Sequence, residues 1–89
     1  MVYVEMVHMA GGNGHEHIAE VRWRNRVSGE TGAASRATMV DFIDNKHGEA
    51  RVADRQGDVA IGVVRATPPY IRTHADGRWS DNLLALPRY

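Results

Sequence analysis

Residues 70–87 read Tyr70-Ile71-Arg72-Thr73-His74-Ala75-Asp76-Gly77-Arg78-Trp79-Ser80-Asp81-Asn82-Leu83-Leu84-Ala85-Leu86-Pro87. The first four of these residues predict a short strand, because aromatic and β-branched side chains fit a pleated surface. Ala75 to Arg78 predicts a turn, since Asp before Gly is typical of a chain reversal. Ser80 is expected to cap a brief helical turn that carries Leu83 and Leu84 and ends at Pro87.

The residues before this stretch predict two more strands. They are Glu49 to Ala53 and Val59 to Arg65, joined by Asp54-Arg55-Gln56-Gly57-Asp58. Gly57 is the expected turn glycine, because glycine adopts a positive φ without a steric penalty. Residues 60, 62 and 64 form a small apolar face of the second strand, which indicates that another element approaches it closely.

An amphipathic helix is predicted from about Arg36 to His47, because apolar residues recur there at spacings of three and four. These residues are Met39, Val40, Phe42 and Ile43. Ser35 is expected to cap the first turn of the helix with its side-chain oxygen. Gly48 is expected to end the helix in the left-handed conformation.

The first third of the chain predicts a long hairpin. Met1 to Met9 and His17 to Arg26 alternate in the manner of strands, and Ala10 to Gly14 between them is rich in glycine. Val27 to Ala34 is small and polar, so we expect it to be a loop.

The expected fold is α+β, with one small, mostly antiparallel sheet of about five strands and a single helix packed on one face. The expected order is strand, strand, helix, strand, strand, strand. A small, partly closed β-barrel is the alternative, because Gly62 and the glycine-rich turns permit strong curvature. Residues 1–89 make a single domain, since each of two cores would fall near or below about 40 residues, where chains rarely fold unaided.

The composition favours strands and narrows the class of protein. Valine occurs ten times and isoleucine four times, and cysteine is absent, which excludes disulfides and thiolate metal sites. The first nine residues lack the features of a signal peptide, and no stretch has the length of a membrane span. We therefore expect a cytoplasmic protein that does not bind a membrane, and the sequence indicates no cofactor.

The C-terminal stretch resembles the C-terminal signature of an uncharacterised bacterial family, domain of unknown function 3892. The residues that carry this resemblance are Tyr70-Ile71-Arg72-Thr73, Asp76 and Asp81-Asn82-Leu83-Leu84-Ala85-Leu86-Pro87. His17 to Trp23 is similar to the second strand of that family, and Met39 to Ile43 to its helix. The resemblance implies a small stand-alone domain of bacteria or their phages and brings no activity, cofactor or partner.

Arginines form the strongest candidate for a binding surface. Arg22, Arg24 and Arg26 project from one face of the predicted hairpin, in a row of about 13 Å that matches two or three phosphates. However, the chain has eleven basic and eleven acidic residues, so its overall field does not attract polyanions. Cross-strand ion pairs with Glu5 and Glu20 explain the row equally well.

Histidines give two weaker candidates. His15 and His17 are two residues apart on a segment expected to be extended, with His8 across the hairpin, but no fourth metal ligand is marked. His74 and Asp76 resemble an acid-base pair, although Asp before Gly suits a turn better. The residues expected to have structural roles are Ser35, Gly48, Tyr70, Arg72, Thr73, Asp76, Gly77, Asp81 and Asn82.

We therefore expect a non-catalytic interaction domain without a cofactor or metal, whose partner is a second copy of the chain or another protein. A chain of this length buries only about 60 to 65% of its unfolded surface, so association would supplement a thin core. The alternative is a module that binds nucleic acid or another polyanion through Arg22, Arg24 and Arg26.

Overall fold

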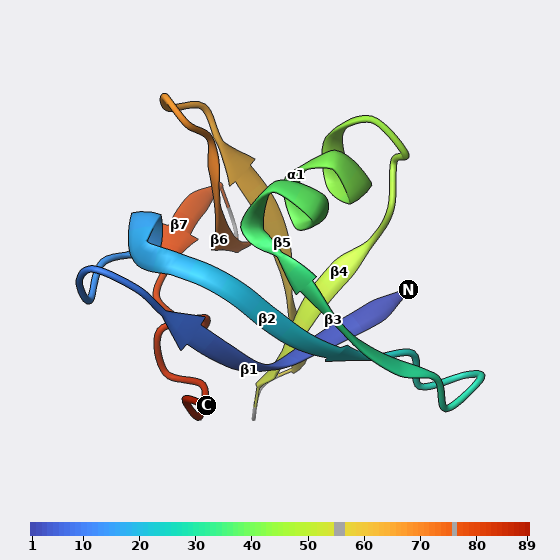
Figure 1. Ribbon diagram of the computed structural model, residues 1–89. Helices are drawn as coiled ribbons and strands as arrows, with labels where there is room; N and C mark the ends of the chain where they lie inside the picture. Colours follow the sequence, from blue (N-terminus) through green and yellow to red (C-terminus); the bar gives the residue numbers. More distant parts are fainter. Residues whose placement is uncertain (55–56, 76) are drawn as a thin grey trace.

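A computed structural model describes residues 1–54, 57–75 and 77–89 of the chain. Within those ranges, seven strands, one α-helix and a short 3₁₀ helix form (Figure 1). In chain order they are β1 (Val2–Met9), η1 (His15–His17), β2 (Ile18–Arg24), β3 (Thr31–Ser35), α1 (Arg36–Asp44), β4 (Ala50–Asp54), β5 (Gly57–Val64), β6 (Tyr70–Ala75) and β7 (Arg78–Ser80). No helix in the described ranges is long and apolar enough to cross a membrane.

The described strands form one mixed sheet in the order β3-β2-β1-β4-β5-β6-β7. Strands β1 and β4 are parallel, and all other neighbours are antiparallel. The α+β class is confirmed, although the sheet has more strands than the predicted five. The sheet is open, with β3 and β7 at its edges, so the alternative of a partly closed barrel is wrong.

Both added strands lie where loops or turns were predicted. The prediction of a loop at Val27 to Ala34 is wrong, because β3 pairs with β2 in continuous register from Thr31 to Ser35. Gly32 permits this packing, since a Cβ there would lie 2.6 Å from the indole of Trp23. The second added strand, β7, follows Gly77, which has the positive φ of 76° that a turn requires.

Helix α1 covers one face of the sheet and contacts β2, β3, β5 and β6 (Figure 1). Met39 is buried, and Phe42 and Ile43 pack against the same core. The remaining fully buried or nearly buried apolar residues are Val4, Val7, Ile18, Val21, Ala50, Val52, Ile61, Ile71 and Leu83. The predicted burial of the helix against the sheet is therefore confirmed.

Only the N-terminal end of α1 lies where the sequence predicts it. The Ser35 side-chain oxygen accepts a hydrogen bond from the Thr38 amide at 3.2 Å, as an N-cap does. The helix ends at Asp44, three residues before the predicted end, and His47 rather than Gly48 has a positive φ, at 52°. Gly48 is needed for space instead, because a Cβ there would lie 2.3 Å from the Phe42 ring.

Three smaller expectations are corrected. His15–His17 forms η1 rather than an extended segment. Ser80 caps no helix: it ends β7, and residues 82–85 form hydrogen-bonded turns in which the Ala85 amide donates to the Asp81 carbonyl. The predicted turn at 54–58 falls partly outside the described residues, but Gly57 has a positive φ of 123°, as expected.

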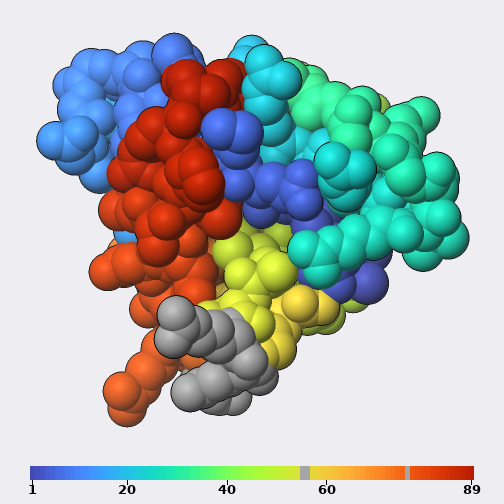
Figure 2. Space-filling view, turned by 90° about the horizontal axis from the view of Figure 1, so that it is seen from below, coloured from blue at the N-terminus to red at the C-terminus, as the bar shows by residue number. Residues whose placement is uncertain are grey.

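Strand β1 has neighbours along both of its edges. Strand β2 follows one edge, and β4 pairs with the other edge only at Val2 and Tyr3. Beyond β4 the C-terminal residues take over, since the Val7 amide donates to the Pro87 carbonyl and the Tyr89 amide donates to the Val7 carbonyl. Figure 2 shows this segment, in red, against the blue N-terminal strand.

The close contact between Gly48 and Phe42 predicts a stability effect. Gly48→Ala should lower the free energy of unfolding by about 1 to 3 kcal/mol, because the added methyl group overlaps a ring that packs against the core. Urea denaturation of both proteins measures this difference. Gly14→Ala is the matched control, since its Cβ would meet only the movable carboxylate of Glu16. Equal losses in both variants would contradict this explanation.

Candidate functional site

The arginine row is paired within the molecule. Arg24 Nε lies 3.3 Å from Glu5 Oε1. The guanidinium of Arg22 lies 4.7 Å from the centre of the Tyr89 ring, and that of Arg26 lies 3.8 Å from the centre of the Tyr3 ring. Strand β2 places Arg22 and Arg24, whereas Arg26 lies in the turn after it.

The tyrosines of this face are themselves held by carboxylates. The Tyr89 hydroxyl donates to Glu20 at 2.6 Å, and burial together with this bond raises the pKa of Tyr89 to about 12. The Tyr3 hydroxyl donates to Asp58, which raises the pKa of Tyr3. The face therefore alternates cations, rings and carboxylates, and it presents no unbroken positive stripe.

A second polar cluster joins β6 to the segment after β7. The Thr73 hydroxyl donates to the Ser80 carbonyl at 3.0 Å and accepts from the Asn82 amide at 3.1 Å. The Ser80 hydroxyl donates to the Asn82 side-chain oxygen at 2.7 Å. Arg72 donates to Asp81 at 2.9 Å. These bonds fix the path of the chain from β6 to the C-terminal turns.

His15 lies at the border of this cluster. Its residue is 7% exposed, and its Nε2 atom, 3.7 Å from Asp81 Oδ1, has no hydrogen-bond partner. Burial lowers the pKa of His15, and the charge of Arg72 lowers it further, while Asp81 and Glu16 oppose the shift. Burial and the neighbouring arginine therefore both favour the neutral form of the His15 imidazole.

The other histidines do not gather around it. His8 Nδ1 lies 2.6 Å from the Tyr89 carbonyl oxygen, and His17 lies 3.5 Å from Glu16. Among the described residues, no group of three or more His, Cys, Asp or Glu side chains is placed to hold a metal ion. His74 is exposed and packs edge-on against Trp79, and its predicted neighbour Asp76 lies outside the described residues.

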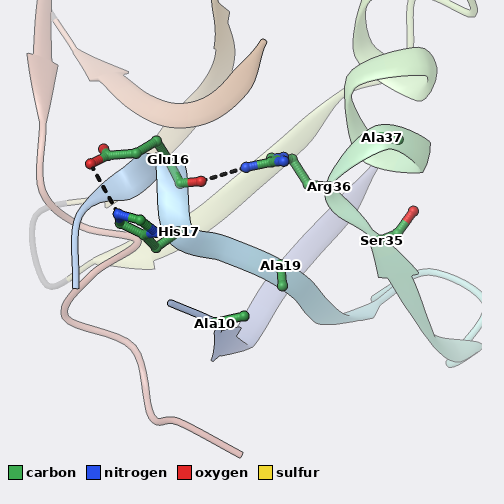
Figure 3. A pocket seen from close by; sticks show the side chains of 7 residues that line it. All are labelled: Ala10, Glu16, His17, Ala19, Ser35, Arg36 and Ala37. Atoms are coloured by element: carbon green, nitrogen blue, oxygen red, sulfur yellow. Dashed lines mark hydrogen bonds and ion pairs between the residues drawn. The ribbon is translucent and has the colours of Figure 1, made fainter. Parts of the chain in front are cut away.

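A concavity of about 410 Å³ opens where the chain passes from β3 into α1. It is lined by Ala10, Glu16, His17, Ala19, Ser35, Arg36 and Ala37 (Figure 3). The Arg36 side chain reaches across to donate to the Glu16 carbonyl. The hollow is wide and shallow, with a cationic side at Arg36 and an acidic side at Glu16.

Strand β3 forms one edge of the sheet directly beside this concavity. Its sequence, Thr31-Gly32-Ala33-Ala34-Ser35, contains no charge and no proline, and its register with β2 has no bulge. Natural proteins usually protect such an edge with charges, prolines, bulges or a very short strand. The opposite edge, β7, is only three residues long and begins with Arg78.

The comparison with known families agrees with the C-terminal signature. A family model described as a protein of unknown function (DUF3892) matches residues 2–87. The chain belongs to this family. No curated protein and no solved structure matches the chain.

In this DUF3892 chain, four of the residues that carried the resemblance lie in the cluster around Thr73. Two hydrogen bonds join the residues expected to have structural roles there: Arg72 with Asp81, and Asn82 with Thr73. Tyr70 begins β6. Sequence reasoning missed the open edge at β3 and the burial of His15. The signal for the edge was a small, uncharged segment next to Trp23, which was interpreted as a loop.

The buried imidazole predicts a pH dependence of stability. Between its lowered native pKa and the usual value near 6.5, the unfolded chain binds a proton that the native chain does not. The free energy of unfolding should therefore fall as the pH is lowered from about 7 to 5, and His15→Gln should flatten this fall. His47→Asn is the control, because His47 is exposed and Asn tolerates its positive φ. Identical pH slopes for wild type and His15→Gln would contradict the prediction.

Proposed function

We propose that this DUF3892 protein is a small non-catalytic interaction domain that binds a partner strand at the edge of β3 and thereby self-associates. The unguarded edge is the observation that supports this function most strongly. Main-chain hydrogen bonds to an added strand supply affinity in many protein complexes. We further propose that the protein acts in the cytoplasm of bacteria or their phages, where a chain without cysteine needs no oxidising environment.

The hydrogen-bond pattern shows which groups of β3 face outward. The Asn25 amide donates to the Glu30 carbonyl at 2.7 Å, and these two residues continue the β2–β3 register. In an antiparallel ladder, bonded and non-bonded pairs alternate. Gly32 and Ala34 therefore face β2, and the amides and carbonyls of Thr31 and Ala33 point away from the sheet.

The small size of the core also supports association. A chain of 89 residues has a thin margin of stability without disulfides, and a strand added at β3 would pair backbone groups on the side of β3 that faces away from β2. The hydroxyl and amide side chains of the cluster around Thr73 have structural contacts rather than a catalytic arrangement. Hydrogen bonds within this cluster join Thr73, Ser80 and Asn82 to one another.

Binding of a polyanion at the arginine row is a second candidate function. Arg22 and Arg24 are exposed on one face, and a guanidinium that stacks on a ring keeps the N–H donors at its edge for an anion. Glu5 and Glu20 in the same region weaken this candidate, because they offer competing carboxylates. We therefore rank it below association at β3.

Proline at position 33 tests the proposed function. Ala33→Pro should convert a dimer into a monomer, since it removes an outward amide without removing a bond to β2. Light scattering at micromolar concentration measures the mass, with 9.9 kDa for one chain. Ala33→Ser is the matched control, because it keeps the amide and should remain dimeric.

A wild-type chain that stays monomeric, or a dimer that persists in a folded Ala33→Pro variant, would contradict association at β3. A monomer that binds heparin at low salt, and loses this binding when Arg22, Arg24 and Arg26 are changed to Ser, would instead support the polyanion function.

A further inference from the structure

The outward groups of β3 restrict how a second strand can pair with it. A bonded pair in an antiparallel ladder needs an outward residue on each strand, so odd-numbered residues must face odd-numbered residues. When two copies of β3 pair about an axis at Ala33, each of the five residues 31–35 has a partner. Any neighbouring register leaves part of β3 without a strand partner in each copy.

The side chains on this edge suit the same register. Ala33 would face its own copy, which requires a small and uncharged side chain, and Thr31 would face Ser35. Neither pairing brings like charges together. The exposed segment before β3, Val27 to Glu30, would lie beside the start of α1 in the other copy.

The charges at the two ends of β3 decide between this register and its neighbours. Glu30 precedes the strand and is exposed, and Arg36 follows it. With the axis at Ala33, Glu30 of one copy lies opposite Arg36 of the other, and the symmetry makes this pair twice. In the adjacent registers, Glu30 would lie opposite Ala34 or Thr38 instead.

The concavity in Figure 3 adjoins the end of β3, because Ser35, Arg36 and Ala37 form part of its lining. Its cationic wall is Arg36, whose guanidinium is anchored on the Glu16 carbonyl, and its carboxylate at Glu16 is already near His17 at 3.5 Å. In the proposed dimer, the Arg36 guanidinium would turn from the Glu16 carbonyl toward the Glu30 carboxylate of the other copy.

We propose that the partner at β3 is a second copy of this chain, paired antiparallel about a twofold axis at Ala33, with Glu30 of each copy seated against Arg36 of the other. This inference rests on the proposed function and specifies its partner and register. The two sheets then join into one continuous sheet through β3 and its copy, and the open edge disappears.

Charge reversal at these two positions tests the register. Glu30→Arg and Arg36→Glu should each weaken the dimer by about tenfold, because each places like charges together at both ends of the interface. An equimolar mixture of the two variants should recover the wild-type affinity, since a mixed dimer restores opposite charges at both contacts. The double variant should recover it as well, and sedimentation equilibrium measures all five dissociation constants, including that of the wild type.

Recovery in the mixture also separates weakened association from misfolding, because a misfolded chain cannot be rescued by another variant. Lys46→Glu, an exposed charge reversal beyond the end of α1, is the control and should leave the dimer unchanged. If Ala33→Pro dissociates the dimer but neither charge reversal has an effect, this register is wrong and association at β3 stands. If the wild-type chain is monomeric at every concentration, both proposals fail.

Discussion

The structure depends on the need of strand β1 for hydrogen-bond partners along two full edges. Strand β2 satisfies one edge, but β4 meets the other only at Val2 and Tyr3. The C-terminal residues complete that edge through Val7, so the first and last segments of the chain hold each other in place. Buried backbone groups without partners are costly, which makes this closure a condition for the sheet to form at all.

Closure at β1 leaves the sheet with two free edges, and they differ in character. Strand β7 is short and follows a tight turn at Gly77, whereas β3 is longer, regular and uncharged. Helix α1 leaves directly from the end of β3 and lies over the inner face, so it covers the core without covering the edge. The interaction proposed for this protein follows from that geometry, because β3 is the longer of the two edges at which the described strands lack a neighbour.

Much of this fold was predictable from local patterns. The alternation in Met1 to Met9 and in His17 to Arg26 identified β1 and β2, and the spacing of Met39, Phe42 and Ile43 identified α1, since these signals depend only on neighbouring residues. Strand β3 was not predictable in that way, because its small residues have little tendency to form strands and gain it only by pairing beneath Trp23. The role of Gly48 also depends on a packing contact, with the ring of Phe42, rather than on its own backbone conformation.

The sequence predicted which residues form the candidate site, but it did not predict which side chains contact them. The row of Arg22, Arg24 and Arg26 is present, but the rings that hold two of these arginines come from opposite ends of the chain. The charges that act on His15 come from Arg72 and Asp81, which lie more than fifty residues away in sequence. No pattern within a single segment indicates such contacts.

Amide hydrogen exchange, followed residue by residue at several protein concentrations, tests association at β3 most directly. We expect protection of the Ala33 amide to rise with concentration, while the Ala34 amide, which faces β2, stays protected throughout. Exchange at Ala33 that is equally fast at all concentrations would contradict the account.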